Sequence, residues 1–206
     1  MEGAIDMKRI VIATNNAHKV EEIRTALDFP DWEFLTLSQV VPYPEPIEDA
    51  DTFEGNALIK ACAAHEATGL AALADDSGLV VDALDGAPGA FSARYAGVHG
   101  DDAANNAKVL RELAGVPDER RTARFVCALA FVDEDGSETL ARGTIEGRIG
   151  RELRGSEGFG YDPMFLPDEF GGSKTLAEVS QAEKNAISHR GNALRELRAK
   201  LEGLSQ

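Results

Sequence analysis

Residues 8–13 read Lys-Arg-Ile-Val-Ile-Ala, a short run rich in β-branched side chains. Such a run is typical of a buried strand. The residues that follow, 14–19, read Thr-Asn-Asn-Ala-His-Lys, and Val20, Ile23 and Leu27 then recur on one face of a helix. The sequence therefore predicts a strand, a polar turn and an amphipathic helix in direct succession.

The turn between this strand and this helix is suited to binding an anion. The first N–H groups of a helix have no partner within the helix, and the helix dipole is positive at that end. Lys19 adds a full positive charge. The turn contains no glycine, so it is neither a Walker loop nor a dinucleotide-binding fingerprint. Taken alone, an ordinary capped helix after a first strand explains it more simply.

The rest of the chain alternates strand and helix patterns. Further strands are predicted near 33–37, 71–74, 79–82, 123–133 and 138–149, and helices near 17–28, 52–68, 101–114 and 181–203. The last two strands are joined by Asp133-Glu134-Asp135-Gly136 and predict an antiparallel hairpin. We therefore predict an α/β fold with a twisted mixed β-sheet and flanking helices.

No linker, repeat or low-complexity stretch divides the chain. The proline-rich stretch 41–47 comes nearest to a boundary, but it is short. We therefore predict a single domain over 1–206. Residues 1–7 precede the first strand and are interpreted as a dispensable extension or a misassigned start.

Two acidic clusters are candidates for a metal site. Residues 74–78 read Ala-Asp-Asp-Ser-Gly between two apolar runs, so the acids are predicted in a turn or at a strand end. Adjacent carboxylates repel, and a cation offsets the repulsion. Residues 48–51, Glu-Asp-Ala-Asp, could face the same ion or cap the helix that follows. In that helix Asn56 and Lys60 share a face, where the lysine would reach a phosphate or form a surface ion pair.

Two further motifs lie near the C-terminal end of the chain. Residues 158–163 read Gly-Phe-Gly-Tyr-Asp-Pro, and residues 188–191 read Ser-His-Arg-Gly. An aromatic ring can stack on a nucleobase, glycine permits close approach of the backbone, and arginine offers several N–H groups to an anion. Together the motifs indicate a flat, polar, anionic ligand. Each alone is explained equally well by a loop packed in the core or by a surface His-Arg pair.

These motifs together resemble the Ham1/RdgB-type nucleoside triphosphate pyrophosphatases, the inosine triphosphatase family. The likeness runs in the family's order from residue 10 to residue 195. Asn15 stands where glycine is frequent in the family and Gly55 where an acid is frequent, and neither change removes a functional group. The matching motifs are Thr14-x-Asn16-x-x-Lys19, Thr52-Phe53-x-x-Asn56-Ala57-x-x-Lys60-Ala61, Ala74 to Leu79, Gly86-Ala87-Pro88-Gly89 with Ser92-Ala93-Arg94-Tyr95, Gly158 to Pro163, and Glu183-Lys184 through Gly191.

The resemblance implies a fold and an activity. The fold would have two lobes around a nucleotide-binding cleft, and the protein would form a homodimer. The activity would be hydrolysis of non-standard purine nucleoside triphosphates, namely ITP, dITP and XTP, to the monophosphate and pyrophosphate, which cleanses the nucleotide pool. Mg2+ would be the cofactor.

The resemblance also implies roles for individual residues. Asp76 is the expected catalytic base, with Asp75 as the alternative, and Asp76 and Glu48 are the expected Mg2+ ligands. The base of the substrate would stack on Phe159. The expected substrate-binding residues are Thr14, Asn15, Asn16, Ala17, His18, Lys19, Lys60, Ser77, Phe159, Gly160, Tyr161, Asp162, Lys184, His189 and Arg190.

Two alternatives remain at this point. A Maf-like pyrophosphatase would share the general chemistry, but residues 188–191 and 159–162 argue against it. A nucleotide-binding sensor without turnover would keep the base pocket and would not need the acids. Asp75, Asp76 and Glu48 are all present, which favours the enzyme.

Composition limits the partners of the chain. Its 206 residues include 21 basic and 36 acidic side chains, a net charge of −15. This charge disfavours nucleic-acid backbones and anionic membranes but allows a small nucleotide bound at a local basic site. Cys62 and Cys127 lack metal or redox spacing, and the histidines show no zinc pattern. With no apolar stretch long enough for a signal or membrane helix, a cytoplasmic location is expected.

Overall fold

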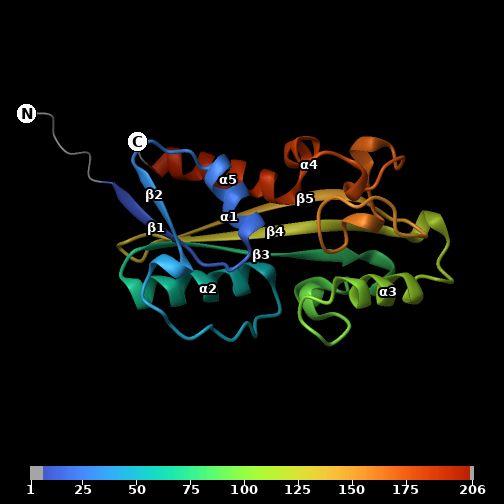
Figure 1. Ribbon diagram of the computed structural model, residues 1–206, viewed down its shortest axis with the longest axis horizontal. Coiled ribbons are helices and arrows are strands. Elements are labelled where there is room, and N and C mark those ends of the chain that lie inside the picture. The colour runs from blue at the N-terminus through green and yellow to red at the C-terminus, as the bar shows by residue number, and fades with distance from the viewer. Residues whose placement is uncertain (1–6, 205–206) are drawn as a thin grey trace, which may run out of the picture. The chain divides into compact units, whose positions relative to one another are not determined.

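The computed structural model describes residues 7–204 and shows a six-stranded sheet with helices (Figure 1). The sheet has the order β2-β1-β3-β4-β5-β6. Its strands are β1 (Lys8–Ile12), β2 (Trp32–Thr36), β3 (Ala71–Val81), β4 (Thr122–Val132), β5 (Glu138–Ile149) and β6 (Phe165–Pro167). The α-helices of the described residues are α1 (Ala17–Ala26), α2 (Phe53–Thr68), α3 (Asp102–Glu112), α4 (Gln181–Ile187) and α5 (His189–Leu204).

The sheet is mixed, which confirms the predicted α/β class. β1 runs parallel to both β2 and β3, whereas β5 and β6 are antiparallel. β4 and β5 are neighbours joined by a turn in which the Asp133 N–H donates to the Ser137 carbonyl at 2.9 Å. A link this short can join neighbouring strands only if they are antiparallel, so the predicted hairpin is confirmed.

The described residues divide into two compact units. The first comprises the chain up to Asp76, Ala128–Arg142 and the chain from Ala193 onward, and the second comprises Ser77–Cys127 and Gly143–Asn192. β3, β4 and β5 each contribute residues to both units. The single domain over 1–206 stays a prediction. Of the predicted N-terminal extension, residues 1–6 lie outside the described residues.

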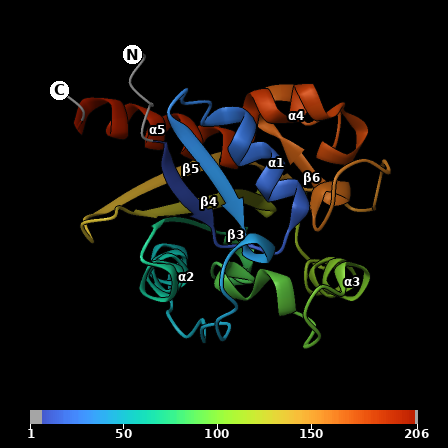
Figure 2. The same cartoon turned by 60° about the vertical axis from the view of Figure 1, so that its left-hand side comes forward.

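In the first unit, α1 and α2 cover opposite faces of the sheet (Figures 1 and 2). α2 packs through a small-residue face of fully buried alanines, Ala57, Ala61 and Ala64. Trp32 of β2 stacks on Phe131 of β4, with ring centroids 5.5 Å apart and an interplanar angle of 10°. The buried alanines hold α2 close to the sheet, and the ring stack joins β2 to β4.

In the second unit, α3 and α4 lie on opposite faces of the sheet (Figures 1 and 2). Its core combines side chains from β3, α3, β4, β5 and β6, among them Leu79, Val109, Phe125, Ile149 and Phe165. Among residues 7–204, no helix combines the length and apolar character that crossing a bilayer requires.

The predicted break between strands at 71–74 and 79–82 is wrong. β3 runs without interruption from Ala71 to Val81, so Asp75 and Asp76 lie in the middle of a strand. The acids do not need a turn, because the Asp75 carboxylate is ion-paired with Lys19 and the Asp76 carboxylate with Lys60. The continuous strand places both carboxylates inside the fold.

The single helix predicted over 181–203 is also wrong, because it is two helices. Ser188 adopts an extended conformation, with φ −62° and ψ 150°, between α4 and α5. Its hydroxyl accepts a hydrogen bond from the Gly191 N–H at 3.0 Å, which caps α5. Ser180 and Glu183 form a capping box at the start of α4. The break places His189 and Arg190 in the first turn of α5.

Arg121 is a buried side chain that connects separate segments of the second unit by hydrogen bonds. Its buried guanidinium donates to the carbonyl oxygens of Leu113 at 2.6 Å, Ile149 at 2.8 Å and Gly150 at 2.6 Å. Leu113 caps the C-terminal end of α3, where a cation is favourable. One side chain thus joins a helix end to the end of β5.

Replacing Arg121 with alanine is expected to lower the free energy of unfolding by at least about 2 kcal/mol, because three carbonyls lose a charged donor. Urea unfolding followed by circular dichroism measures the change. Arg120→Ala, at an exposed neighbouring position, is the control and is expected within about 0.5 kcal/mol of wild type. Equal stability of the two variants would contradict the role given to Arg121.

Candidate active site

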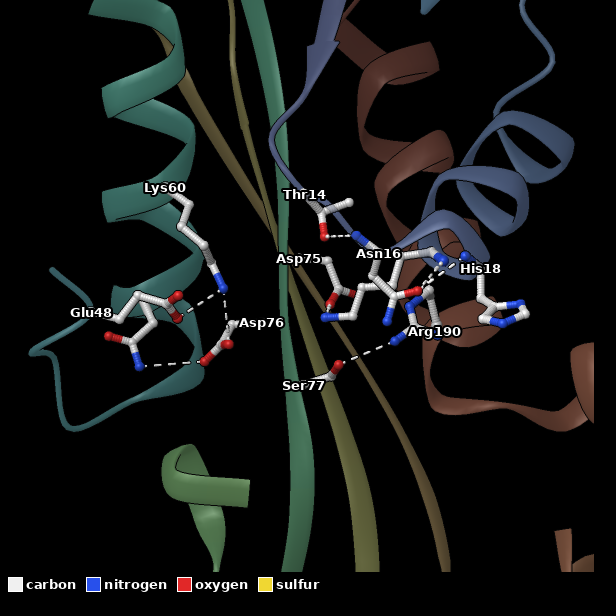
Figure 3. A network of polar contacts seen from close by, with 11 residues as sticks. Thr14, Asn16, His18, Glu48, Lys60, Asp75, Asp76, Ser77 and Arg190 are labelled. Atoms are coloured by element: carbon white, nitrogen blue, oxygen red, sulfur yellow. Dashed lines mark hydrogen bonds and ion pairs between the residues drawn. The ribbon is translucent and has the colours of Figure 1, made fainter. Parts of the chain in front are cut away.

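The turn after β1 is closed on itself by Asn16. The Asn16 side-chain oxygen caps α1 by accepting from the N–H groups of His18 at 3.0 Å and Lys19 at 3.3 Å, and the Asn16 N–H donates to Thr14 Oγ1 at 3.2 Å (Figure 3). Two of the first-turn N–H groups predicted to bind an anion therefore already donate to a side chain of the turn itself.

Other predicted residues of this turn lie at the surface. Asn15, Ala17 and His18 are exposed. Thr14, Asn15 and Ala17 border a hollow of about 420 Å³, whose other walls come from α1 and from residues 36–38. A ligand can therefore reach the turn from solvent.

Asp75 is a buried carboxylate paired with a lysine. Its side chain is 0% exposed and forms an ion pair with the Lys19 ammonium, which comes from the first turn of α1. A buried carboxylate needs such a partner because it has lost its hydration. The pair fixes the start of α1 against β3.

Asp76 belongs to a second cluster, in which one lysine contacts two carboxylates. Lys60 Nζ lies 2.9 Å from Glu48 Oε2 and 3.0 Å from Asp76 Oδ1. Figure 3 shows the lysine reaching down from α2 between the two acids. The Asp76 side chain is 14% exposed, so unlike Asp75 it is open to a ligand.

The electrostatics of this cluster favour a proton-accepting Asp76. Burial raises the pKa of Asp76 above its ordinary value, the Lys60 ammonium lowers it, and the Glu48 charge raises it again. Burial lowers the pKa of Lys60, but the charges of Asp76 and Glu48 outweigh burial, so its pKa is raised and the ammonium stays protonated. Asp76 is therefore more basic than an ordinary aspartate, and it lies beside a fixed positive charge.

Asn56 completes the cluster, although the sequence does not assign it a role. Its side-chain oxygen accepts from the Ala50 N–H at 3.1 Å, and its Nδ2 donates to Asp76 Oδ2 at 3.4 Å. Asn56 is buried and ties the acidic segment 48–51 to β3. The sequence signals are its spacing from Lys60 on one face of α2 and its place in the family-like motif of residues 52–61.

Glu48 and Asp76 fit a divalent cation of the magnesium type. Both carboxylates converge on one ammonium, so their oxygens already lie around a position that favours positive charge. Within residues 7–204, no group of three or more His, Cys, Asp or Glu side chains is arranged to hold a metal. Mg2+ is commonly held by one or two carboxylates together with waters and substrate phosphates, so two protein ligands suffice.

In the second unit, Asp162 organises the loop that carries Phe159. Asp162 Oδ2 accepts from the Phe159 N–H at 2.9 Å and from Lys184 Nζ at 2.6 Å. Burial raises the pKa of Asp162, and the Lys184 ammonium and the Phe159 N–H oppose this rise. The Lys184 ammonium also lies 4.6 Å from the centre of the Phe159 ring, which is 36% exposed. The result is an exposed aromatic ring beside a buried ion pair.

Tyr161 and Gly160 anchor the same loop. The Tyr161 ring is buried, and its hydroxyl donates to the Ser92 carbonyl at 2.7 Å. The Gly160 backbone is bound by two side chains of α3, Asp102 and Asn106, which the sequence does not single out. Tyr161, predicted to bind substrate, therefore lies inside the fold.

His189 and Arg190 begin α5 and are both buried. The His189 ring stacks on Phe125, with centroids 4.9 Å apart and an interplanar angle of 14°. Arg190 Nη2 donates to Ser77 Oγ at 3.1 Å (Figure 3). Ser77 follows Asp76 directly in β3, so the chain itself links the acidic cluster to the contacts of Arg190.

Carboxylate–lysine pairs on an α/β fold are typical of proteins that act on small anionic ligands, and an exposed aromatic ring is typical of proteins that bind a ligand with a flat ring. This chain belongs to the Ham1 family, whose model matches residues 10–200. It is 52% identical over 202 residues to the dITP/XTP pyrophosphatase of Nocardia farcinica, which covers 97% of each chain. It is 53% identical over 191 residues to that of Cutibacterium acnes, covering 92% of this chain and 94% of the relative.

Solved structures agree with this assignment. The Ham1 protein of Staphylococcus aureus matches with a TM-score of 0.87 and 41% identity, covering 96% of this chain and 100% of that one. A HAM1 protein from Coxiella burnetii matches with a TM-score of 0.86 and 44% identity at the same coverage. The fold class predicted from the sequence, α/β with a mixed sheet, is therefore confirmed.

Replacing Gly158 with alanine is expected to lower the melting temperature more than replacing Gly160. Both glycines have a left-handed backbone conformation, with φ +75° and +62°. An alanine in this conformation is destabilised by about 1 to 2 kcal/mol. Only at Gly158 would the added Cβ also collide with Asp162, lying 2.1 Å from Oδ2, whereas at Gly160 it meets nothing within 4 Å. Differential scanning fluorimetry measures both variants, and equal losses would show that the Asp162 carboxylate does not constrain Gly158.

Proposed function

We propose that this protein hydrolyses non-standard purine nucleoside triphosphates, dITP, XTP and ITP, to the monophosphate and pyrophosphate. The observation that carries the proposal is the Lys60 ammonium held between Glu48 and Asp76, in a chain about half identical to relatives named dITP/XTP pyrophosphatase. A protein that only binds nucleotides has no need for two carboxylates around one lysine.

Asp76 is the proposed acceptor of the proton from the attacking water. A bond forms between the water oxygen and the α-phosphorus, and the bond from that phosphorus to the bridging oxygen breaks, so that pyrophosphate leaves. The raised pKa of Asp76 favours this role, since a base works best when its pKa approaches the working pH. Asp75 is the weaker candidate, because its side chain is fully buried against Lys19.

Charged and short polar side chains are the proposed contacts of the phosphates. Lys19 and Lys60 supply positive charge, and the turn from Thr14 to Lys19 supplies short polar side chains. Glu48 and Asp76 would hold Mg2+, which neutralises phosphate oxygens when bound. The protein therefore orients the substrate mainly through charge.

Phe159 is the proposed stacking surface for the purine base, with Asp162, His189 and Arg190 at the polar edge of that base. A 6-oxo purine presents an acceptor at O6 and a donor at N1, whereas adenine presents an amino group and a bare N1. A site with buried donors rejects the ligand that leaves them unpaired. This logic separates inosine and xanthine nucleotides from ATP.

The protein is further proposed to act as a homodimer on a free nucleotide, with no nucleic-acid or membrane partner. The net charge of −15 supports a small-molecule substrate over a polyanionic one. Analytical ultracentrifugation tests the dimer.

Pyrophosphate release is expected to be fast with dITP, XTP and ITP and slow with ATP when the four are compared at equal concentration with Mg2+. Phosphate detection after addition of a pyrophosphatase measures the rates. Equal kcat/KM for ATP and dITP would overturn the proposed base selection. Absence of pyrophosphate from all four would overturn the proposed activity.

Asp76→Asn is expected to lower kcat by at least about a hundredfold while nucleotide binding survives, because an amide cannot accept the water proton. Glu48→Gln is expected to raise the Mg2+ concentration needed for half-maximal rate but to keep most of the rate at saturating Mg2+, since an amide is a weaker ligand for a hard cation. In a magnesium titration, excess Mg2+ should therefore restore the rate of Glu48→Gln but not the rate of Asp76→Asn. A near-normal kcat for Asp76→Asn would move the base to another residue.

A further inference from the structure

Two side chains of α3 form hydrogen bonds to the backbone of one residue in the loop that carries Phe159, residues 158–163. The Gly160 N–H donates to Asp102 Oδ2 at 2.9 Å, and Asn106 Nδ2 donates to the Gly160 carbonyl oxygen at 2.9 Å. Asp102 and Asn106 are four residues apart in α3 and therefore share a face of the helix. One turn of helix thus binds both backbone polar groups of a single glycine.

Gly160 depends on these two hydrogen bonds for its position. It is left-handed, with φ +62°, a conformation that glycine alone adopts without strain. It has no side chain to pack, so hydrogen bonds to its backbone are what orient it. The Phe159 N–H is bound in turn by Asp162. The backbone is therefore held on both sides of Phe159, at its own N–H and at the next residue.

Asn106 carries an energetic cost that a purely structural contact would not require. It is 4% exposed, and its Oδ1 has no hydrogen-bond partner within residues 7–204. A buried polar atom without a partner destabilises a fold, and leucine would fill the same space without one. The neighbouring Asn105 is 1% exposed with both ends of its amide bonded, to the Ala96 N–H at 2.7 Å and the Ala93 carbonyl at 3.3 Å.

We propose that Asp102 and Asn106 are positioning residues that orient the Phe159 ring for the base of the nucleotide. The inference rests on the proposed function, since it deepens the account of the base site. An exposed ring contributes most to binding when its orientation is fixed before the ligand arrives. The two side chains supply that order through the backbone and do not touch the ligand themselves.

The main test is Asn106→Leu, which removes the donor to Gly160 and also the unpaired buried oxygen. The Kd for IMP, measured by isothermal titration calorimetry, and the KM for dITP are expected to rise roughly three- to tenfold. The kcat is expected to stay within about twofold, and the melting temperature should not fall. A merely structural asparagine would give the reverse, a lower melting temperature with unchanged binding.

Two matched variants sharpen this test. Asn105→Leu, one residue away and equally buried, is expected to lower the melting temperature and leave the Kd for IMP unchanged. Asp102→Ala should weaken IMP binding as Asn106→Leu does, whereas Asp102→Asn should restore it, because an amide oxygen can still accept the Gly160 N–H. Equal loss of IMP binding in Asn105→Leu and Asn106→Leu would overturn the inference.

A double-mutant cycle with Phe159→Ala gives the decisive comparison. If Asn106 acts through the ring, Asn106→Leu should change the Kd for IMP by less than about twofold once the ring is absent. The same factor in both backgrounds would overturn the proposal.

The outcomes for this inference and for the proposed activity are separable. Wild-type protein that binds IMP with the expected coupling but releases no pyrophosphate from dITP would overturn the activity alone. If the protein is active but Asn106→Leu leaves the Kd for IMP unchanged, the positioning role alone would be overturned. Wild-type protein that neither binds IMP nor releases pyrophosphate from dITP would overturn both.

Discussion

Two consecutive carboxylates in the middle of β3 constrain the whole first unit. Side chains alternate along a strand, so Asp75 and Asp76 point to opposite faces of the sheet. α1 and α2 cover those faces, and each sends one lysine inward, Lys19 to Asp75 and Lys60 to Asp76 (Figure 3). A buried carboxylate without a partner costs several kcal/mol. One dipeptide therefore dictates where both helices must place a cation.

The same alternation places Asp75 and Asp76 in different chemical environments. Asp75 is paired with Lys19 and its side chain is fully buried, while Asp76 shares Lys60 with Glu48 and remains partly open. Two carboxylates in different surroundings can take different tasks, one structural and one chemical. Asn56 adds to this division by holding the acidic segment 48–51 near Asp76 without bringing another charge.

The sequence predicted the elements whose pattern is local. β1, the turn and α1 follow from a β-branched run and helical spacing, and the hairpin of β4 and β5 follows from two long apolar runs with a short link. The sequence predicts the acids at 75 and 76 in a turn or at a strand end and not within a strand, because the lysine that stabilises Asp75 lies 56 residues away in the sequence. β6 spans only Phe165–Pro167, too short for any periodicity to appear. The roles of Asp102 and Asn106 likewise arise from contacts with a loop more than 50 positions further along, which spacing cannot reveal.

The stacked pair of Trp32 and Phe131 has a spectroscopic consequence. Trp32 is the single tryptophan of the chain, and it lies in the first unit, where β2 meets an aromatic side chain of β4. Its emission therefore reports on the packing around β2. Phe159 and its loop belong to the second unit, which contains no tryptophan. Loosening of that loop would therefore not change the tryptophan emission directly, and a fluorophore attached in the second unit would be needed to observe it at those wavelengths.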